Sequence, residues 1–143
     1  MEDDVADALR VVISQLSRRL NTSATHENLS PSQASVLSVV AERRSIGMAE
    51  LTRTEGLNPT MSSRIVAALD QLALVRRVPN PSDLRSVTVE ITEAGLEAKK
   101  RIRTQRDRVV ARALGGLPAE QVEAIATALP AMRDLVRMLD SLR

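Results

Sequence analysis

The sequence predicts a mainly α-helical protein with a small antiparallel β-wing, and three observations indicate this class. Towards both ends of the chain, apolar residues recur at steps of three and four, as they do on amphipathic helices. Near the middle, a tight break at residues 55–60 separates two short helical stretches, the first starting within Ser45–Leu51 after a glycine. The hydrophobic period then changes to that of a strand at Val75–Val78, and polar residues 79–85 turn the chain back into Val87–Ile91.

The other helices are placed by their apolar spacing and their caps. A first helix of about 20 residues is predicted by the repeat of Val5, Leu9, Val12 and Leu16. Ser30–Pro31 predicts the start of a second helix, and Thr92 caps another that ends at Gly115–Gly116. Between residues 97 and 108 the latter has one large apolar residue, Ile102. We expect a helix so polar to bridge two bodies rather than to cover a core.

The last helix is predicted to carry two apolar stripes. The first has the spacing of a coiled-coil seam and consists of Val122, Ile125, Leu129, Met132, Val136 and Leu139. The second lies beside it and consists of Ala128, Ala131, Leu135, Met138 and Leu142. Two stripes need two partners, so we expect one to cover the first helix and the other to bind a second subunit; a single broad core stripe is the alternative. Pro130 predicts a kink.

The order helix, turn, helix and two-stranded ribbon is that of a winged helix-turn-helix, which reads double-stranded DNA. We therefore expect one domain over residues 1–143, with a winged DNA-binding part at residues 30–92. The remaining residues, 1–29 and 93–143, are expected to form a helical dimerisation part. Its candidate interface residues are those of the first helix, Val5, Leu9, Val12 and Leu16, together with the first stripe of the last helix.

Composition and charge exclude several classes of protein. The 143 residues include no cysteine, which excludes disulfides, thiolate metal sites and cysteine redox switches. They include no Phe, Tyr or Trp, so single-stranded nucleic acid would find no aromatic platform. No apolar run has the length of a membrane span, and the acidic start Met1–Asp4 differs from a signal peptide, so we expect a cytoplasmic protein.

The net charge of +2 is unevenly distributed along the chain. Residues 1–42 hold three Arg against six Asp and Glu, whereas residues 43–108 hold thirteen Lys and Arg against eight Asp and Glu. The positive charge therefore lies in and just after the winged part, where DNA phosphates would attract it. The alternative for Lys99, Lys100, Arg101, Arg103, Arg106 and Arg108 is a solvated helix face.

The second helix of the pair is the candidate recognition helix. Asn58 is a good cap and Pro59 a good first residue. At 100° per residue, one side carries Met61, Ile65, Ala68, Leu69 and Leu72. The opposite side carries Pro59, Thr60, Ser63, Ala67 and Asp70, with Ser62 and Arg64 on the flanks. Small hydroxyl residues allow close approach to the major groove, and Arg64 can reach a guanine or a phosphate. An ordinary solvent-facing helix is the alternative.

The ribbon tip predicts a second DNA contact. Arg85 on a thin ribbon suits the narrow minor groove, and Asp83 is expected to hold its guanidinium in place. The alternative is a surface salt bridge worth less than about 1 kcal/mol.

Taken together, these residues resemble the MarR-type regulators. The similarity rests on Leu29–Ala34, Leu57–Val66, Leu74–Arg77, Asp83–Ser86 and Ile91–Gly95, and the flanking helices match as well. The resemblance implies a homodimer that binds pseudo-palindromic operator DNA, usually as a repressor. Carried over by position, it assigns DNA reading to Asn58–Arg64 and to the wing residues Arg77, Ser82, Asp83, Leu84 and Arg85.

Some positions depart from the family's pattern. Leu84 stands where an arginine is frequent, and Asn80 stands where an aspartate is frequent, so the wing is expected to hold DNA less tightly or to pack Leu84 in the groove. Oxidant-sensing members use a cysteine near the N-terminus, which this chain lacks. Other members bind small phenolic anions between the dimer head and the winged part. A small anionic aromatic effector is therefore expected, held by arginines such as Arg18 and Arg19.

Two other classes of function fit the sequence less well. An enzyme would need a positioned histidine, cysteine or carboxylate pair, and the one histidine, His26, lies in a polar stretch expected to be a loop. We therefore expect no catalytic residue, no cofactor and no metal site. The second class is a winged-helix adaptor that binds proteins and has no operator of its own. The presence of Arg64 and Arg85 argues against it.

Overall fold

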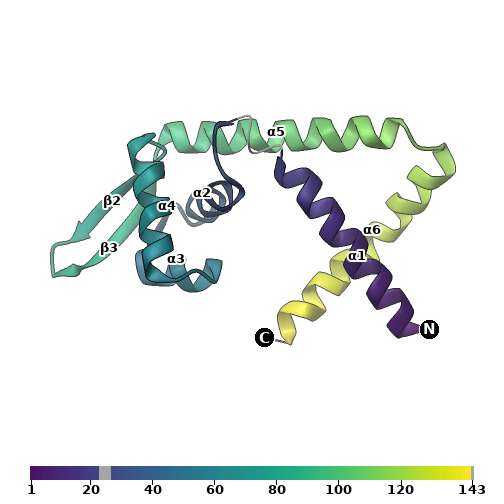
Figure 1. Ribbon diagram of the computed structural model, residues 1–143, viewed down its shortest axis with the longest axis horizontal. Coiled ribbons are helices and arrows are strands. Elements are labelled where there is room, and N and C mark those ends of the chain that lie inside the picture. The colour runs from purple at the N-terminus through teal and green to yellow at the C-terminus, as the bar shows by residue number, and fades with distance from the viewer. Residues whose placement is uncertain (23–26, 143) are drawn as a thin grey trace. The chain divides into compact units, whose positions relative to one another are not determined.

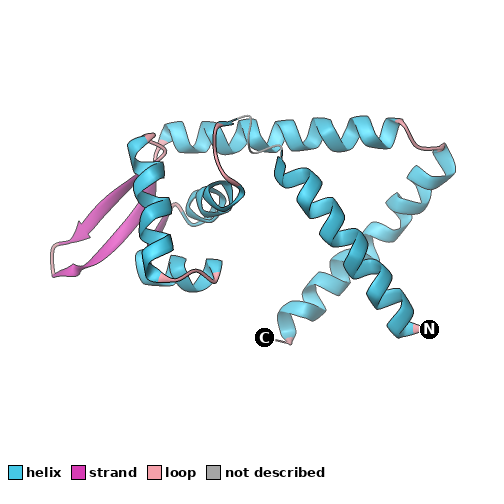
Figure 2. Ribbon diagram, in the orientation of Figure 1, coloured by secondary structure: helices cyan, strands magenta, loops and turns pink. Residues whose placement is uncertain are grey.

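A computed structural model describes residues 1–22 and 27–142, and the expectation for His26 lies outside this range. The elements, in chain order, are α1 (Glu2–Asn21), α2 (Pro31–Arg43), β1 (Ser45–Gly47), α3 (Met48–Glu55), α4 (Pro59–Gln71), β2 (Val75–Asn80), β3 (Asp83–Ile91), α5 (Glu93–Gly115) and α6 (Ala119–Ser141). Figures 1 and 2 show the mainly helical fold with its small antiparallel sheet, which confirms the predicted class.

By its contacts the chain forms two compact units, Met1–Arg106 and Asp107–Arg143. The division between them lies inside the continuous helix α5. The first unit contains the helix-turn-helix, the sheet and the first half of α5. The second contains the end of α5 and α6. The expected separation of a DNA-binding part from a dimerisation part concerns function and stays a prediction.

The helix starts follow from local chemistry, as predicted. Ser30 caps α2 through a reciprocal pair: its Oγ accepts from the Gln33 amide at 3.2 Å, and Gln33 Oε1 accepts from the Ser30 amide at 2.9 Å. Asn58 caps α4 by accepting from the Met61 amide at 2.8 Å, and Pro59 follows as the first residue of the helix. Both helices therefore begin where their sequences require.

The sheet has three strands, in the order β1-β3-β2, rather than two. Both neighbours of β3 are antiparallel to it, and Val89 is opposite Ile46 on one side and Arg77 on the other. The expected helix start after Gly47 is confirmed, since α3 begins at Met48, but the strand formed by Ser45–Gly47 was not predicted. Ile46 is 3% exposed, and it extends the sheet so that its side chain enters the core. Three residues are too few to show the period of a strand.

The hydrophobic core lies in the first unit and is wholly aliphatic. Helices α2, α3 and α4 and the three strands all contribute to it, and so does α5. The expectation that α5 buries no face was wrong for its first half, where Gly95, Ala98 and Ile102 are buried. Two of these three residues are small, so the helix axis can lie close to the core. A search for large apolar residues misses such a face.

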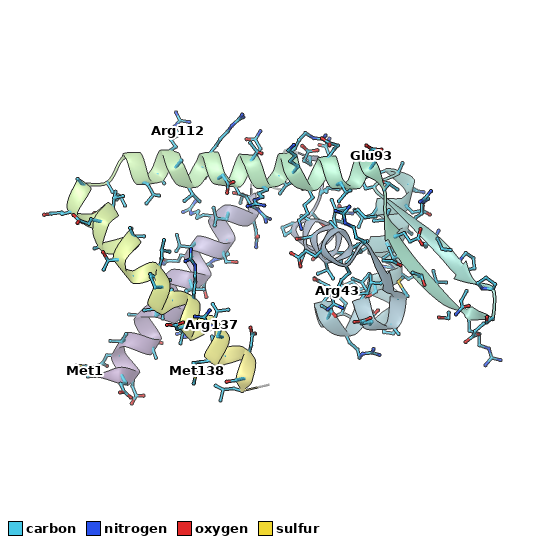
Figure 3. The ribbon with its side chains drawn as sticks, turned by 180° about the vertical axis from the view of Figure 1, so that it is seen from behind. Met1, Arg43, Glu93, Arg112, Arg137 and Met138 are labelled. Atoms are coloured by element: carbon cyan, nitrogen blue, oxygen red, sulfur yellow. The ribbon has the colours of Figure 1, made fainter. Side chains whose placement is uncertain are left out.

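In the second unit, the apolar residues of α6 remain exposed. No residue of α6 is buried, and Val136 and Leu139 are 58% and 56% exposed. The helix continues through Pro130. Arg137 and Met138 extend from its last turns in Figure 3, where Arg112 marks the far part of α5. Within the second unit, both predicted stripes are therefore accessible.

Gly95 offers a test of the close packing between α5 and the core. We expect Gly95→Ala to lower the free energy of unfolding by about 3 kcal/mol or more, because an added Cβ collides with the Leu74 carbonyl oxygen and lies 2.6 Å from Ile91 Cδ1. Gly115→Ala is the matched control, since an added Cβ there meets nothing within 4 Å. Denaturant unfolding at one fixed protein concentration measures both. Equal stability of the two variants would contradict this packing.

Candidate nucleic-acid interface

The recognition helix α4 is rotated about its axis relative to the prediction. Its buried residues are Ser62, Ile65, Val66 and Leu69. Two residues assigned to the inner side, Met61 and Leu72, are 49% and 51% exposed, and that assignment was wrong. The largest apolar side chains of the helix predicted an inner face centred on themselves. In the structure, the contacts of α4 with α2, α3 and β2 centre it nearer to Val66.

Ser62 was expected on an exposed flank as a DNA contact, and this was wrong. It is 1% exposed and is the only buried polar residue among those described. Its hydroxyl shares a hydrogen bond of 2.9 Å with the Thr52 hydroxyl of α3, and Thr52 Oγ1 also lies 2.9 Å from the Met48 carbonyl. Ser62 therefore joins the two helices of the helix-turn-helix, and a buried hydroxyl with a partner is not available to DNA.

The other predicted residues at the start of α4 face outwards. Asn58, Pro59, Thr60, Ser63 and Arg64 are exposed, and Ala67 is half-buried. This surface is made of short side chains apart from Arg64. A duplex can approach such a surface closely.

At the wing tip, Asp83 holds the backbone rather than the arginine side chain. Asp83 Oδ1 accepts a hydrogen bond of 3.0 Å from the Arg85 amide. Asn80 Oδ1 similarly accepts from the Ser82 amide at 2.9 Å. The expected bond from Asp83 to the Arg85 guanidinium does not form, and the carboxylate stabilises a local turn of the backbone instead. Arg85 is exposed, and of Leu84 only the backbone, in β3, is described.

Arg77 connects the wing to the recognition helix. Its Nε lies 3.3 Å from Asp70 Oδ2 on α4. Arg77, which the family resemblance assigned to the DNA-reading wing, forms an ion pair with Asp70 in the structure. Both side chains are more than a third exposed, so the ion pair contributes less than about 1 kcal/mol. Its importance is geometric, since it links β2 to the last turn of α4.

A groove of about 490 Å³ brings the predicted residues of α4 and the wing together. From α4 it is lined by Pro59 and Ser63, and from the wing by Arg77, Arg85 and Val87. The N-terminal part of α3 completes it with Met48, Ala49 and Thr52, which the sequence argument did not single out. The missed signal was the amphipathic pattern of α3, which is only eight residues long.

The charges around this surface are arranged in two ways. Within the residues that the structure describes, the guanidinium groups of Arg64 and Arg85 have no hydrogen-bond or ion-pair partner, whereas Arg43 pairs with Glu50 at 2.8 Å and Arg76 with Glu90 at 3.7 Å.

Among the residues that the structure describes, there is no group of three or more potential metal ligands. None of the described helices is both long and apolar enough to cross a membrane.

Comparison with known proteins agrees with this geometry. The model of the MarR family matches residues 29–87. An uncharacterized HTH-type transcriptional regulator of Mycobacterium bovis, Mb0904, is 30% identical over 132 residues, which are 92% of each chain. An HTH-type transcriptional regulator of Mycobacterium tuberculosis, MT0903.1, shows the same identity and coverage.

Solved structures share the fold. Wild-type MarR of E. coli in its apo form has a TM-score of 0.76 at 21% identity, covering 89% of this chain and 94% of its own. A mutant of MepR from S. aureus, solved bound to an oligodeoxyribonucleotide, has a TM-score of 0.68 at 14% identity, covering 97% and 98%. Because the curated relatives are named as transcriptional regulators, the prediction that the chain is not an enzyme is confirmed. The helix-turn-helix, the wing and a relative matched along nearly its whole length together show that the chain belongs to the MarR family of winged helix-turn-helix transcriptional regulators.

Proposed function

We propose that the protein is a cytoplasmic, homodimeric repressor that binds pseudo-palindromic operator DNA and is released by a small anionic aromatic effector. The observation that carries the DNA-binding part is the groove in which Ser63 of α4 and Arg85 of the wing line one surface. A hydroxyl and a guanidinium that has no partner among the described residues, on adjacent elements, suit two neighbouring parts of a duplex. The DNA-bound MepR mutant, which has the same fold, supports this assignment.

The recognition helix would read bases with its N-terminal half. Thr60, Ser63 and Ala67 are short enough to let the backbone approach the floor of the major groove. Arg64 has no partner within the described residues, so no protein contact must break before it binds a guanine edge or a phosphate. Asn58 and Pro59 set the position of the first turn. Ser62 is left out of this set because it is buried.

The wing would supply the second contact through Arg85. By accepting from the backbone amides of Arg85 and Ser82, Asp83 and Asn80 fix the path of the tip from which Arg85 projects. The backbone of the tip therefore orients Arg85, in place of a carboxylate–guanidinium pair. The charge of Arg85 stays available for a phosphate or for the minor groove. Packing of Leu84 in the groove stays a prediction.

The two DNA contacts are separable by mutation. We expect Ser63→Ala and Arg64→Ala to weaken binding to an operator selected from random duplexes, by about 1–3 kcal/mol where a base contact is lost. Arg85→Ala should weaken binding to operator and random DNA alike and reduce the slope of log K against log salt by about 1. Fluorescence anisotropy with labelled duplexes measures both.

Arg112→Ala is the matched control, since it removes one exposed positive charge from the far part of α5 (Figure 3). It should change neither the operator preference nor the salt slope. An Arg85→Ala protein with the affinity and slope of the wild type would remove the wing from the mechanism. If the wild type itself shows no salt-dependent binding to random duplex DNA, the protein is better described as a winged-helix adaptor for other proteins.

The homodimer is supported by the exposure of apolar residues on the two terminal helices. On α1, Val5, Val12 and Leu16 are 61%, 49% and 54% exposed. On α6, Ile125, Leu129, Met132, Val136 and Leu139 are between 37% and 58% exposed. Leu9 and Val122 are half-buried members of the same proposed interface. Apolar surface on this scale marks an interaction site, and an operator with two half-sites calls for a second copy.

We expect a dimer interface that buries more than about 2,000 Å² in total. The double variant Met132→Asp with Val136→Asp should give monomers or aggregates, because two carboxylates would be buried without partners. Gln121→Asp with Thr127→Asp adds the same charge at exposed polar positions of α6 and should leave the dimer intact. Light scattering distinguishes these states. A stable monomer of the wild type at micromolar concentration would overturn the dimer.

The effector is proposed from the cations of α1 and α5. Arg18 and Arg19 are exposed near the end of α1, and so are Lys100, Arg103 and Arg108 on α5. Two other cations of α5 are already paired. Lys99 Nζ lies 3.6 Å from Glu42, and Arg101 donates to both carboxylate oxygens of Glu27 at 2.9 and 3.1 Å. The hydrogen bond and the charge of Glu27 raise the pKa of Arg101. Within the described residues, the five exposed cations have no ion-pair partner, and they are the ones that an anion would neutralise.

Salicylate at millimolar concentration is expected to reduce operator binding more than sodium chloride does at the same ionic strength. The reason is differential binding: a ligand releases DNA only if it favours the state that does not bind DNA, and a few kcal/mol suffices. Competition titrations with both salts provide the measurement. Equal release by salicylate and chloride would indicate screening alone, and the protein would then be a constitutive DNA binder.

A further inference from the structure

The recognition helix ends in a turn that requires a left-handed residue. After α4, the Leu74 amide donates to the Leu69 carbonyl at 3.0 Å and the Ala73 amide donates to the Asp70 carbonyl at 2.9 Å. This pair of hydrogen bonds defines a Schellman motif, and the residue in its left-handed position is usually glycine. Helix α3 ends in the same motif, with Gly56 at φ +62. After α4 the position is Ala73, at φ +57, where a Cβ is disfavoured.

Thr92 holds this turn by both its side chain and its backbone. Its Oγ1 donates to the Ala73 carbonyl at 2.6 Å, and its amide donates to the Leu74 carbonyl at 3.2 Å. The same Oγ1 accepts from the Gly95 amide at 3.0 Å, which makes Thr92 the cap of α5. One hydroxyl therefore joins the C-terminal turn of the recognition helix to the N-terminal turn of α5.

Gly95 makes this junction tight. Its Cα faces the Leu74 carbonyl so closely that no Cβ fits between them. Beyond the junction, Ala98 and Ile102 are buried in the same core, and Lys99 lies 3.6 Å from Glu42 of α2. The first three turns of α5 are thus attached to the unit that contains α4. A change in the direction of α5 would have to carry the recognition helix with it.

We propose that Thr92 is a positioning residue for DNA binding, because its hydroxyl fixes the orientation of α4 relative to α5. This inference rests on the proposed function as a dimer that binds two half-sites. Such a dimer binds well only when its recognition helices are about one duplex turn, roughly 34 Å, apart. The spacing depends on how each α4 is fixed to the long helix that leaves the winged part, and Thr92 makes that connection.

Three substitutions separate the two roles of the hydroxyl. Thr92→Ser keeps both the cap and the bond to Ala73. Thr92→Asp keeps an acceptor for the Gly95 amide, so α5 begins at the same place, but an ionised carboxylate cannot donate to the Ala73 carbonyl. Thr92→Val keeps the shape and loses both bonds. If the bond to Ala73 positions α4, the Asp and Val variants should behave alike and the Ser variant should behave as the wild type.

The orientation can be measured without DNA, since the chain contains no cysteine. Thr60→Cys at the exposed start of α4 places one spin label on each recognition helix, and pulsed dipolar spectroscopy of the dimer gives their distance distribution. We expect a narrow distribution for the Thr60→Cys protein and its Thr92→Ser variant. For the Thr92→Asp and Thr92→Val variants, we expect the width of the distance distribution to be at least about 1.5 times that of the Thr60→Cys protein. Circular dichroism checks that all four proteins are folded.

Binding to DNA gives the second readout, in proteins without the label. For an operator selected by the wild type, the Thr92→Asp and Thr92→Val variants should bind about tenfold more weakly than the wild type. When two base pairs are inserted between the half-sites, the affinity of these variants should fall less than the affinity of the wild type. A narrow distribution and an unchanged spacing preference for Thr92→Asp would overturn the proposal, and this variant remains decisive should Thr92→Val fail to fold. If the labelled Thr60→Cys protein with the native Thr92 shows no dipolar interaction, the dimer is overturned, and so is the proposal.

Discussion

The structure depends on a core that has no aromatic ring and must therefore be closed by bringing backbones together. The largest fully buried side chains are Leu29, Leu37, Leu51 and Leu69. Where helices meet, small residues replace large ones, so that Ser62 lies against α3 while Gly95 and Ala98 lie against the end of α4 and the core. Close packing with small residues gives dispersion contacts that rings would otherwise supply. It also makes the relative positions of these helices sensitive to a single added methyl group.

This constraint accounts for the arrangement of the proposed DNA-binding surface. Because Ser62 is used to join α3 and α4, the exposed side of α4 presents Thr60, Ser63 and Arg64. The wing is attached to the same helix by the pair between Arg77 and Asp70. The surface arginines thus fall into two groups. Some are paired and organise the fold, whereas Arg64 and Arg85 have no partner in the described part of the chain.

At the junction with α5, one side chain likewise serves two elements. Thr92 ends one element and begins the next with a single hydroxyl, and it compensates for an alanine in a position that favours glycine. A strained residue persists where its surroundings determine it completely, as the bonds to Ala73 and Leu74 do here. The helix that leaves the winged part is therefore an extension of it for three turns. A connection of this kind fixes the orientation of the recognition helix relative to the first three turns of α5.

The sequence by itself determined the helices, the wing and the helix caps, because each depends on neighbouring residues: Ser30 with Gln33, Asn58 with Pro59, and the change of period at Val75. The family resemblance stated from its motifs was also correct. Only the tertiary structure decided which side of α4 is buried, that Ser45–Gly47 is a strand, and which acid pairs with Arg77. These features depend on partners distant in the chain. A helical wheel predicts the buried side from the hydrophobicity of the helix's own side chains. Burial, however, depends on the surface that the helix meets, so Ser62 is buried and Met61 is exposed.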